Sequence, residues 1–144
     1  GREGGINMNK VVYVSRGGNT KKMADAIAKG AGATAEAAPG SKGTFADVLF
    51  VGGSIYAGKM DKQLREYLEA LTPQAAGKVV VFGTAAGVKS LLSEVQSMLL
   101  PKGIAVDGEA FQCKGSFLLA NRGRPNVDDI KAAEEFARKK AARE

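Results

Sequence analysis

Apolar residues follow two alternating patterns along this chain. Short β-branched or continuous apolar runs are typical of buried strands, and they predict strands at residues 10–14, 34–37, 46–51, 78–82 and 104–111. Apolar positions three and four residues apart predict amphipathic helices at residues 20–30, 61–71, 88–100 and 127–142. The weakest of these patterns is the strand at 34–37.

Strands that alternate with helices indicate an α/β domain with a parallel sheet covered on both faces. In such sheets, ligands bind beyond the carboxyl ends of the strands. Three predicted strands end in loops of small residues, at 15–20, 52–58 and 83–87. Because these loops belong to one edge of the sheet, we expect them to converge on one ligand.

The composition of the chain limits the reactions that its own side chains can catalyse. The 144 residues suit one domain, and residues 1–7, which are Gly-rich and precede Met8, are expected to be a cloning scar. The chain has no histidine, which excludes Ser-His-Asp catalysis and histidine metal sites. A single cysteine, Cys113, permits no disulfide within the chain and favours a reducing, cytoplasmic compartment. Difficult chemistry on this chain would therefore depend on a bound organic cofactor.

The charge balance is basic. There are 21 Lys and Arg residues against 15 Asp and Glu, which gives a net charge of +6. The basic residues are dispersed except for Arg138, Lys139, Lys140 and Arg143, which we interpret as a solvated face of the last helix. No aromatic residues are interleaved with them, so nucleic acid is not an expected partner, and no apolar run reaches the roughly 18 residues of a transmembrane segment.

The first loop has the residues of a phosphate site. Glycines at the start of a helix allow free backbone N–H groups to close around a phosphate, and hydroxyl and amide side chains add donors. The loop consists of Ser15, Arg16, Gly17, Gly18, Asn19 and Thr20. This pattern resembles the FMN-phosphate loop of flavodoxins, [Ser/Thr]-x-[Ser/Thr]-Gly-Asn-Thr, with Gly17 in place of a hydroxyl residue. A simple turn and helix cap is the alternative interpretation of the same residues.

The second and third loops extend the resemblance. The second follows Gly52-Gly53 and contains Ser54, Ile55, Tyr56, Ala57 and Gly58; it resembles the flavin loop of flavodoxin-domain proteins and of flavodoxin-like protoporphyrinogen oxidases. The resemblance implies that Tyr56 stacks on the flavin ring and that the glycines permit a peptide flip; a tyrosine that only closes the loop is the alternative. The third loop contains Thr84, Ala85, Ala86 and Gly87 and lacks the aromatic residue of many flavodoxins.

The resemblance covers residues 8–144 and is to the short-chain type. It implies a flavodoxin-like three-layer α/β sandwich, a five-stranded parallel sheet of order 2-1-3-4-5, and FMN as cofactor. The expected function is electron transport by a flavoprotein, without a catalytic side chain or a metal.

Two alternatives stay open at the level of sequence. One is an FMN-dependent oxidoreductase that acts on a quinone- or porphyrinogen-like substrate, favoured by the second loop and the aromatic-free third loop. The other is a flavin-free interaction module on the same fold. Electron-carrier flavodoxins are usually acidic, so this basic chain is expected to meet an acidic redox partner.

Overall fold

The computed structural model of the protein describes residues 8–14, 19–38, 45–53, 55–56, 59–83, 88–112 and 127–141. The expected scar at residues 1–7 lies outside these ranges. A five-stranded sheet forms the centre, in the order β2-β1-β3-β6-β7 with every neighbouring pair parallel. Its strands are β1 (Asn9–Tyr13), β2 (Ala35–Ala37), β3 (Ala46–Gly53), β6 (Ala76–Gly83) and β7 (Phe111–Gln112). Counted along this sheet, the order is the predicted 2-1-3-4-5.

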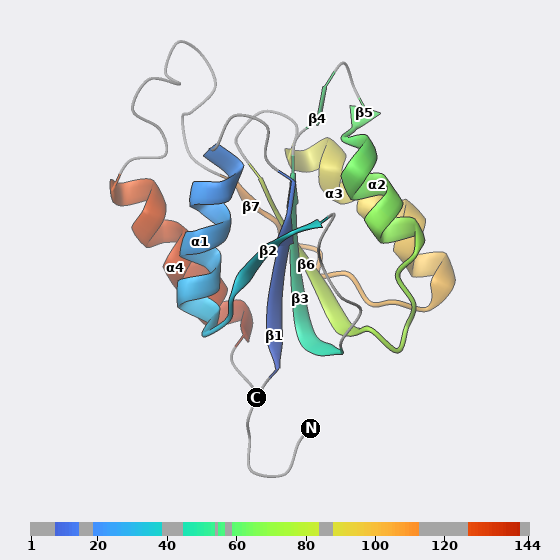
Figure 1. Cartoon of the computed structure of the whole chain (residues 1–144), viewed down its shortest axis with the longest axis horizontal. Helices are drawn as coiled ribbons and strands as arrows, with labels where there is room; N and C mark the ends of the chain where they lie inside the picture. The colour runs from blue at the N-terminus through green and yellow to red at the C-terminus, as the bar shows by residue number, and fades with distance from the viewer. Residues whose placement is uncertain are drawn as a thin grey trace.

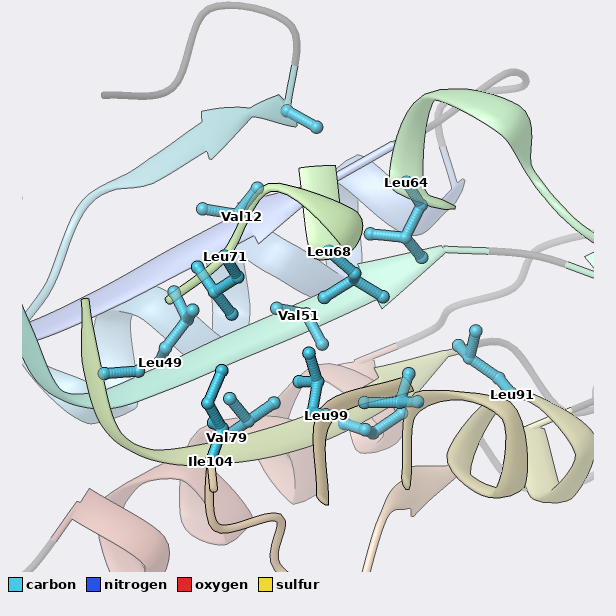
Figure 2. Packing of buried hydrophobic residues seen from close by; sticks show 14 of the residues in the cluster. Val12, Leu49, Val51, Leu64, Leu68, Leu71, Val79, Leu91, Leu99 and Ile104 are labelled. Carbon is cyan, nitrogen blue, oxygen red and sulfur yellow. The ribbon is translucent and has the colours of Figure 1, made fainter. Parts of the chain in front are cut away.

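Helices cover both faces of the sheet, so the domain has three layers (Figure 1). On one face lie α1 (Asn19–Ala31) and α4 (Val127–Ala141), and on the other lie α2 (Lys62–Glu69) and α3 (Val88–Leu99). Each face has its own apolar cluster, and Figure 2 shows the one beneath α2 and α3.

The central strands alternate between these two clusters. In β3, Leu49 and Val51 face α2 and α3, whereas Val48 and Phe50 face α1 and α4. All four are buried, which explains why residues 48–51 are apolar without polar alternation. The predicted buried strands at 46–51 and 78–82 are therefore confirmed.

Helix boundaries follow local chemistry. Gly32, with φ of +67°, comes directly after the last residue of α1, in the left-handed conformation typical of a helix end. Asp61 precedes α2 as its N-cap, and its Oδ1 accepts a hydrogen bond of 2.9 Å from the Gln63 N–H. The α3 helix passes into a 3-10 turn at Leu100–Lys102 because Pro101 has no N–H to continue the α-helical hydrogen bonds.

The predicted strand at 104–111 is wrong in extent. The structure has a single bridge, between Val106 and Val79, and then the two-residue β7. Between them, the Asp107 side chain accepts a hydrogen bond of 2.9 Å from the Glu109 N–H. This Asx turn at Asp107–Gly108 bends the chain out of the sheet, so the predicted strand forms two short pieces.

A lysine from the 3-10 turn stabilises the end of α2. Lys102 Nζ donates to the carbonyl oxygens of Leu68, Glu69 and Leu71 at 3.1, 2.6 and 2.9 Å. A cation at a helix C-terminus satisfies free carbonyls and complements the helix dipole.

We expect Lys102→Met to lower the free energy of unfolding by about 1–2 kcal/mol, since it retains the apolar stem but removes the charged donor. Urea denaturation measures this change. Lys131→Met, at an exposed position of α4, is the control and should change stability by less than about 0.5 kcal/mol. Equal effects of the two substitutions would refute the capping role.

Candidate functional site

Three adjacent strands end side by side at one edge of the sheet. In the β1–β3 register Tyr13 lies beside Gly52, and in the β3–β6 register Gly53 lies beside Gly83. The strands are parallel, so their carboxyl ends lie at the same edge of the sheet (Figure 1). In the sequence, the three predicted loops follow these strand ends.

The connections of the sheet also reverse direction at this edge. From β1 the chain crosses through α1 to β2 on one side, and β3 lies on the other side of β1 and leads on to β6. A parallel α/β sheet has its usual ligand crevice at the carboxyl edge of such a switch point, here between β1 and β3. The predicted phosphate loop follows β1 and the second loop follows β3.

Most of the predicted cofactor residues lie outside the described part of the chain. This holds for residues 15–18, 54, 57–58 and 84–87. Asn19 and Thr20 form the first turn of α1, and the Thr20 side chain is buried, with 4% of its surface exposed. For all these residues, contact with a cofactor stays a prediction.

The second predicted loop contains strands that the sequence did not indicate. Ile55–Tyr56 forms β4 and Lys59–Met60 forms β5, and the two pair as an antiparallel ribbon. Only residues 57 and 58, Ala-Gly in the sequence, separate the strands, which is the spacing of a tight hairpin. Met60 is buried in the cluster beneath α2 and α3, so the ribbon is attached to the core next to Asp61, the N-cap of α2.

The two glycines at the end of β3, Gly52 and Gly53, lie where neighbouring side chains leave no room for a Cβ atom. A Cβ atom added at Gly52 would overlap the ring of Phe82, its neighbour on β6. A Cβ atom added at Gly53 would lie 2.8 Å from Leu64 Cδ2, on α2. The space that side chains would take here is therefore filled by Phe82 and Leu64. This role was missed by sequence reasoning, because it depends on which residue of β6 lies beside Gly52.

Lysine residues occupy the first turns of α1, α2 and α3, the helices that begin at this edge of the sheet. The first turns of α1, α2 and α3 contain no acidic residue. Instead they carry Lys21 and Lys22 on α1, Lys62 on α2 and Lys89 on α3. A hydrogen bond with Asp25, together with its charge, raises the pKa of Lys21. Among these four helices only α4 begins with acids, Asp128 and Asp129.

The basic cluster near the chain's C-terminus has a different environment. Lys140 pairs with Asp107 at 3.1 Å and Glu109 at 2.8 Å, and its ammonium lies 5.7 Å from the centre of the Phe136 ring. Burial works to raise the pKa of Asp107, but the Glu109 N–H and the ammonium groups of Lys140 and Lys78 hold it below its ordinary value. These contacts connect α4 to the turn before β7, so this lysine is structural.

A pocket of about 580 Å³ lies beside this network, between the turn before β7 and α4. Its lining includes Glu109, Phe111, Glu135 and Phe136. It is at the outer strand of the sheet, away from the switch point between β1 and β3, so it is not the predicted ligand crevice. Within the described ranges, no group of three or more His, Cys, Asp or Glu side chains is placed to hold a metal ion.

Comparison with known proteins agrees with this topology. The family model described as a flavodoxin domain matches residues 10–100, which run from β1 to the end of α3. The chain belongs to the flavodoxin-domain family. The matched part contains both strands of the switch point and all three predicted loops.

Individual relatives of this flavodoxin-domain protein are distant. An uncharacterised protein of Methanocaldococcus jannaschii is 34% identical over 103 residues, which are 64% of this chain and 67% of that protein. The flavodoxin, WrbA-like protein from Agrobacterium tumefaciens has a TM-score of 0.69 at 20% identity, with 94% of this chain and 96% of that chain covered. A short-chain flavodoxin associated with a non-canonical PDU bacterial microcompartment has a TM-score of 0.66 at 17% identity, with 94% and 99% covered. These two structural likenesses establish the fold.

The described helices of this flavodoxin-domain protein include none that is both long and apolar enough to cross a lipid bilayer.

Proposed function

We propose that this flavodoxin-domain protein binds FMN at the carboxyl edge of β1 and β3 and carries electrons. The observation that carries the proposal is the switch point itself. The ends of β1 and β3 lie side by side there, and the phosphate-loop pattern follows β1 in the sequence. Membership of the flavodoxin-domain family supports the same cofactor.

The described residues at this edge suit a phosphate dianion. The first turn of α1 has free backbone N–H groups, a partial positive charge, the Thr20 hydroxyl and no carboxylate. Lys21 and Lys22 add positive charge in the same turn. An acid at this position, such as the Asp128 and Asp129 pair of α4, would repel the phosphate.

The protein's part in the chemistry is binding and electrostatics. Bound FMN would supply one- or two-electron transfer, and no side chain need act as an acid or base. The α1 N-terminus would hold the phosphate, and the β4–β5 ribbon would border the ring. The buried contacts of Gly52 with Phe82 and of Gly53 with Leu64 fix the strand end from which that ribbon begins.

We expect the chain to quench FMN fluorescence saturably and to bind FMN more tightly than riboflavin, which has no phosphate. Thr20→Val retains the β-branched shape and replaces the hydroxyl with a methyl group. It should weaken FMN binding roughly tenfold to hundredfold, because a hydrogen bond to a charged group contributes about 1.5–3 kcal/mol. Riboflavin binding should not change.

The matched control is Thr34→Val, an exposed threonine beyond the other end of α1. It should leave both affinities as they are. Without saturable quenching at about 10–50 μM FMN, a threshold near −6 kcal/mol, the cofactor proposal fails. Equal affinities for FMN and riboflavin would remove only the phosphate assignment at α1.

A further inference from the structure

We infer that the outer side of α4, together with the turn before β7, is the surface through which two copies of this chain associate. The surface is the lining of the pocket of about 580 Å³, which we call the α4 face. It consists of Glu109, Phe111, Ala132, Glu135, Phe136, Arg138 and Lys139. It is at the outer strand of the sheet, and β6 separates it from β3 and the switch point. The inference is therefore independent of the proposed cofactor.

Two phenylalanine rings form the aromatic part of the α4 face. Phe111 of β7 and Phe136 of α4 lie with their ring centres 5.3 Å apart and their planes tilted by 51°. Phe136 is only half-buried. The Lys140 ammonium lies 5.7 Å from its ring centre and is itself paired with two carboxylates, so the ring is supported from within the chain. Aromatic side chains that are held in place and still have surface to bury are typical of the residues that stabilise protein interfaces most.

The side chains of α4 form two stripes that point in different directions. The buried stripe consists of Ala133, Ala137 and Ala141, and it belongs to the cluster that α4 shares with α1. Among the described elements, α1 is the main packing partner of α4. The second stripe lines the pocket and consists of Ala132, Glu135, Phe136 and Lys139. Its members are three or four residues apart, so they share one face of the helix and present it to a further partner.

The charges of the α4 face sum to zero, in contrast to the chain as a whole. Its two acids, Glu109 and Glu135, are balanced by Arg138 and Lys139, whereas the chain has a net charge of +6. Two copies therefore repel each other in most orientations, and contact through a neutral face avoids much of that repulsion. A strongly acidic or strongly basic partner would find no net attraction here. The balance of charge favours a second copy of the chain as the occupant.

A two-fold axis makes these charges complementary. When two α4 helices lie antiparallel, with the axis at the level of Ala137, Glu135 of each copy lies opposite Lys139 of the other, because both positions are two residues from the axis. The two Phe136 side chains are one residue from the axis and meet at the centre, between the ion pairs. Glu135 also pairs with Arg138 at 3.7 Å within the helix, but exposed pairs of this kind contribute little and leave the carboxylate able to bind across the axis.

The test measures the dimer dissociation constant of the full chain by sedimentation velocity, in about 0.1 M salt and from about 1 μM to about 0.5 mM protein. Glu135→Lys and Lys139→Glu are made separately and together. The matched controls are Glu66→Lys, Lys62→Glu and their combination on α2, at exposed positions with the same spacing of four residues on the other face of the sheet. They change the net charge by the same amounts. Thermal melting at the lowest concentration checks that every variant is folded.

We expect the wild type to form a dimer within this concentration range. Glu135→Lys and Lys139→Glu should each weaken the dimer roughly tenfold, since each replaces two attractions across the axis with two repulsions. The double variant exchanges the two charges, so its dissociation constant should return to within about threefold of the wild-type value. The control variants should also stay within about threefold, because charges far from the contact are screened at this salt concentration.

A wild-type chain that stays monomeric at about 0.5 mM would overturn the inference. Equal weakening by Glu135→Lys and Glu66→Lys would do the same, because net charge alone would then account for the effect. A dimer that tolerates both single substitutions on α4 uses another surface. A double variant that does not recover shows that Glu135 and Lys139 do not face each other, and either result refutes the two-fold contact. None of these outcomes depends on whether FMN binds.

Discussion

Phe82→Ala is expected to lower the free energy of unfolding by about 3–5 kcal/mol, which is a large part of the stability of an ordinary domain. Phe82 has no exposed surface, belongs to the cluster beneath α1 and α4, and lies beside Gly52 on the neighbouring strand. Removing its ring leaves a cavity that the sheet cannot close, because the strands on both sides are held by the ladder. Urea denaturation of the variant and the wild type measures the loss.

The contact between Phe82 and Gly52 can be tested separately with a double-mutant cycle. Gly52→Ala alone should cost about 1–3 kcal/mol, because its methyl group overlaps a ring that is itself packed in the core. In the Phe82→Ala background the same methyl group enters the vacated space, and Gly52→Ala should be neutral or stabilising. A double-mutant cycle therefore yields a coupling well above the roughly 0.5 kcal/mol expected of independent sites. Gly108→Ala, in open space, is the additive control; additive effects at Gly52 and Phe82 would refute the packing.

The fold was predictable because its strongest patterns are local. Residues 48–51 and 79–82 are apolar at every position, and all of them are buried because strand residues face the two helix layers in alternation. Even the weak pattern at 34–37 was assigned correctly, as β2 at Ala35–Ala37. The alternation of strands and helices is compatible with few sheet topologies. The resemblance of the first loop to the phosphate loop of flavodoxins selected the order 2-1-3-4-5 among them.

Other features depend on contacts that periodicity does not encode. The turn at Asp107–Gly108 divides the predicted strand at 104–111 because the Asp107 carboxylate accepts a hydrogen bond from the Glu109 N–H. The use of Lys102 as a cap for α2 joins residues more than 30 positions apart. The lysines of α1 and α2 appeared dispersed in the sequence, and only the parallel sheet brings Lys22 and Lys62 to one edge. The predicted cofactor contacts at residues 15–18 and 84–87 lie outside the described residues and remain predictions.

The packing of α1 against α4 is the other place where a single added group should have a large effect. Ala24, Ile27 and Ala28 of α1 and Ala133 and Ala137 of α4 are buried in one cluster. At Gly30 the helices come so close that an added Cβ would overlap the backbone carbonyl of Glu134. A backbone atom within a helix cannot turn aside as a side chain can, so any side chain at this position must push the two helices apart.

Gly30→Val is therefore expected to lower the free energy of unfolding by about 3 kcal/mol, at the upper end of the usual cost of overpacking. Intrinsic helix propensity does not contribute to this loss, because valine is a better helix former than glycine. Gly108→Val is the matched control, since nothing lies within 4 Å of a Cβ atom there, and it should change stability by less than about 0.5 kcal/mol. Urea denaturation followed by circular dichroism measures both variants.

NMR tests whether the helices move apart. The signals of the buried methyl groups of α1 and α4 should shift in Gly30→Val and not in Gly108→Val. A Gly30→Val protein as stable as the wild type would mean that α1 and α4 do not pack at this distance.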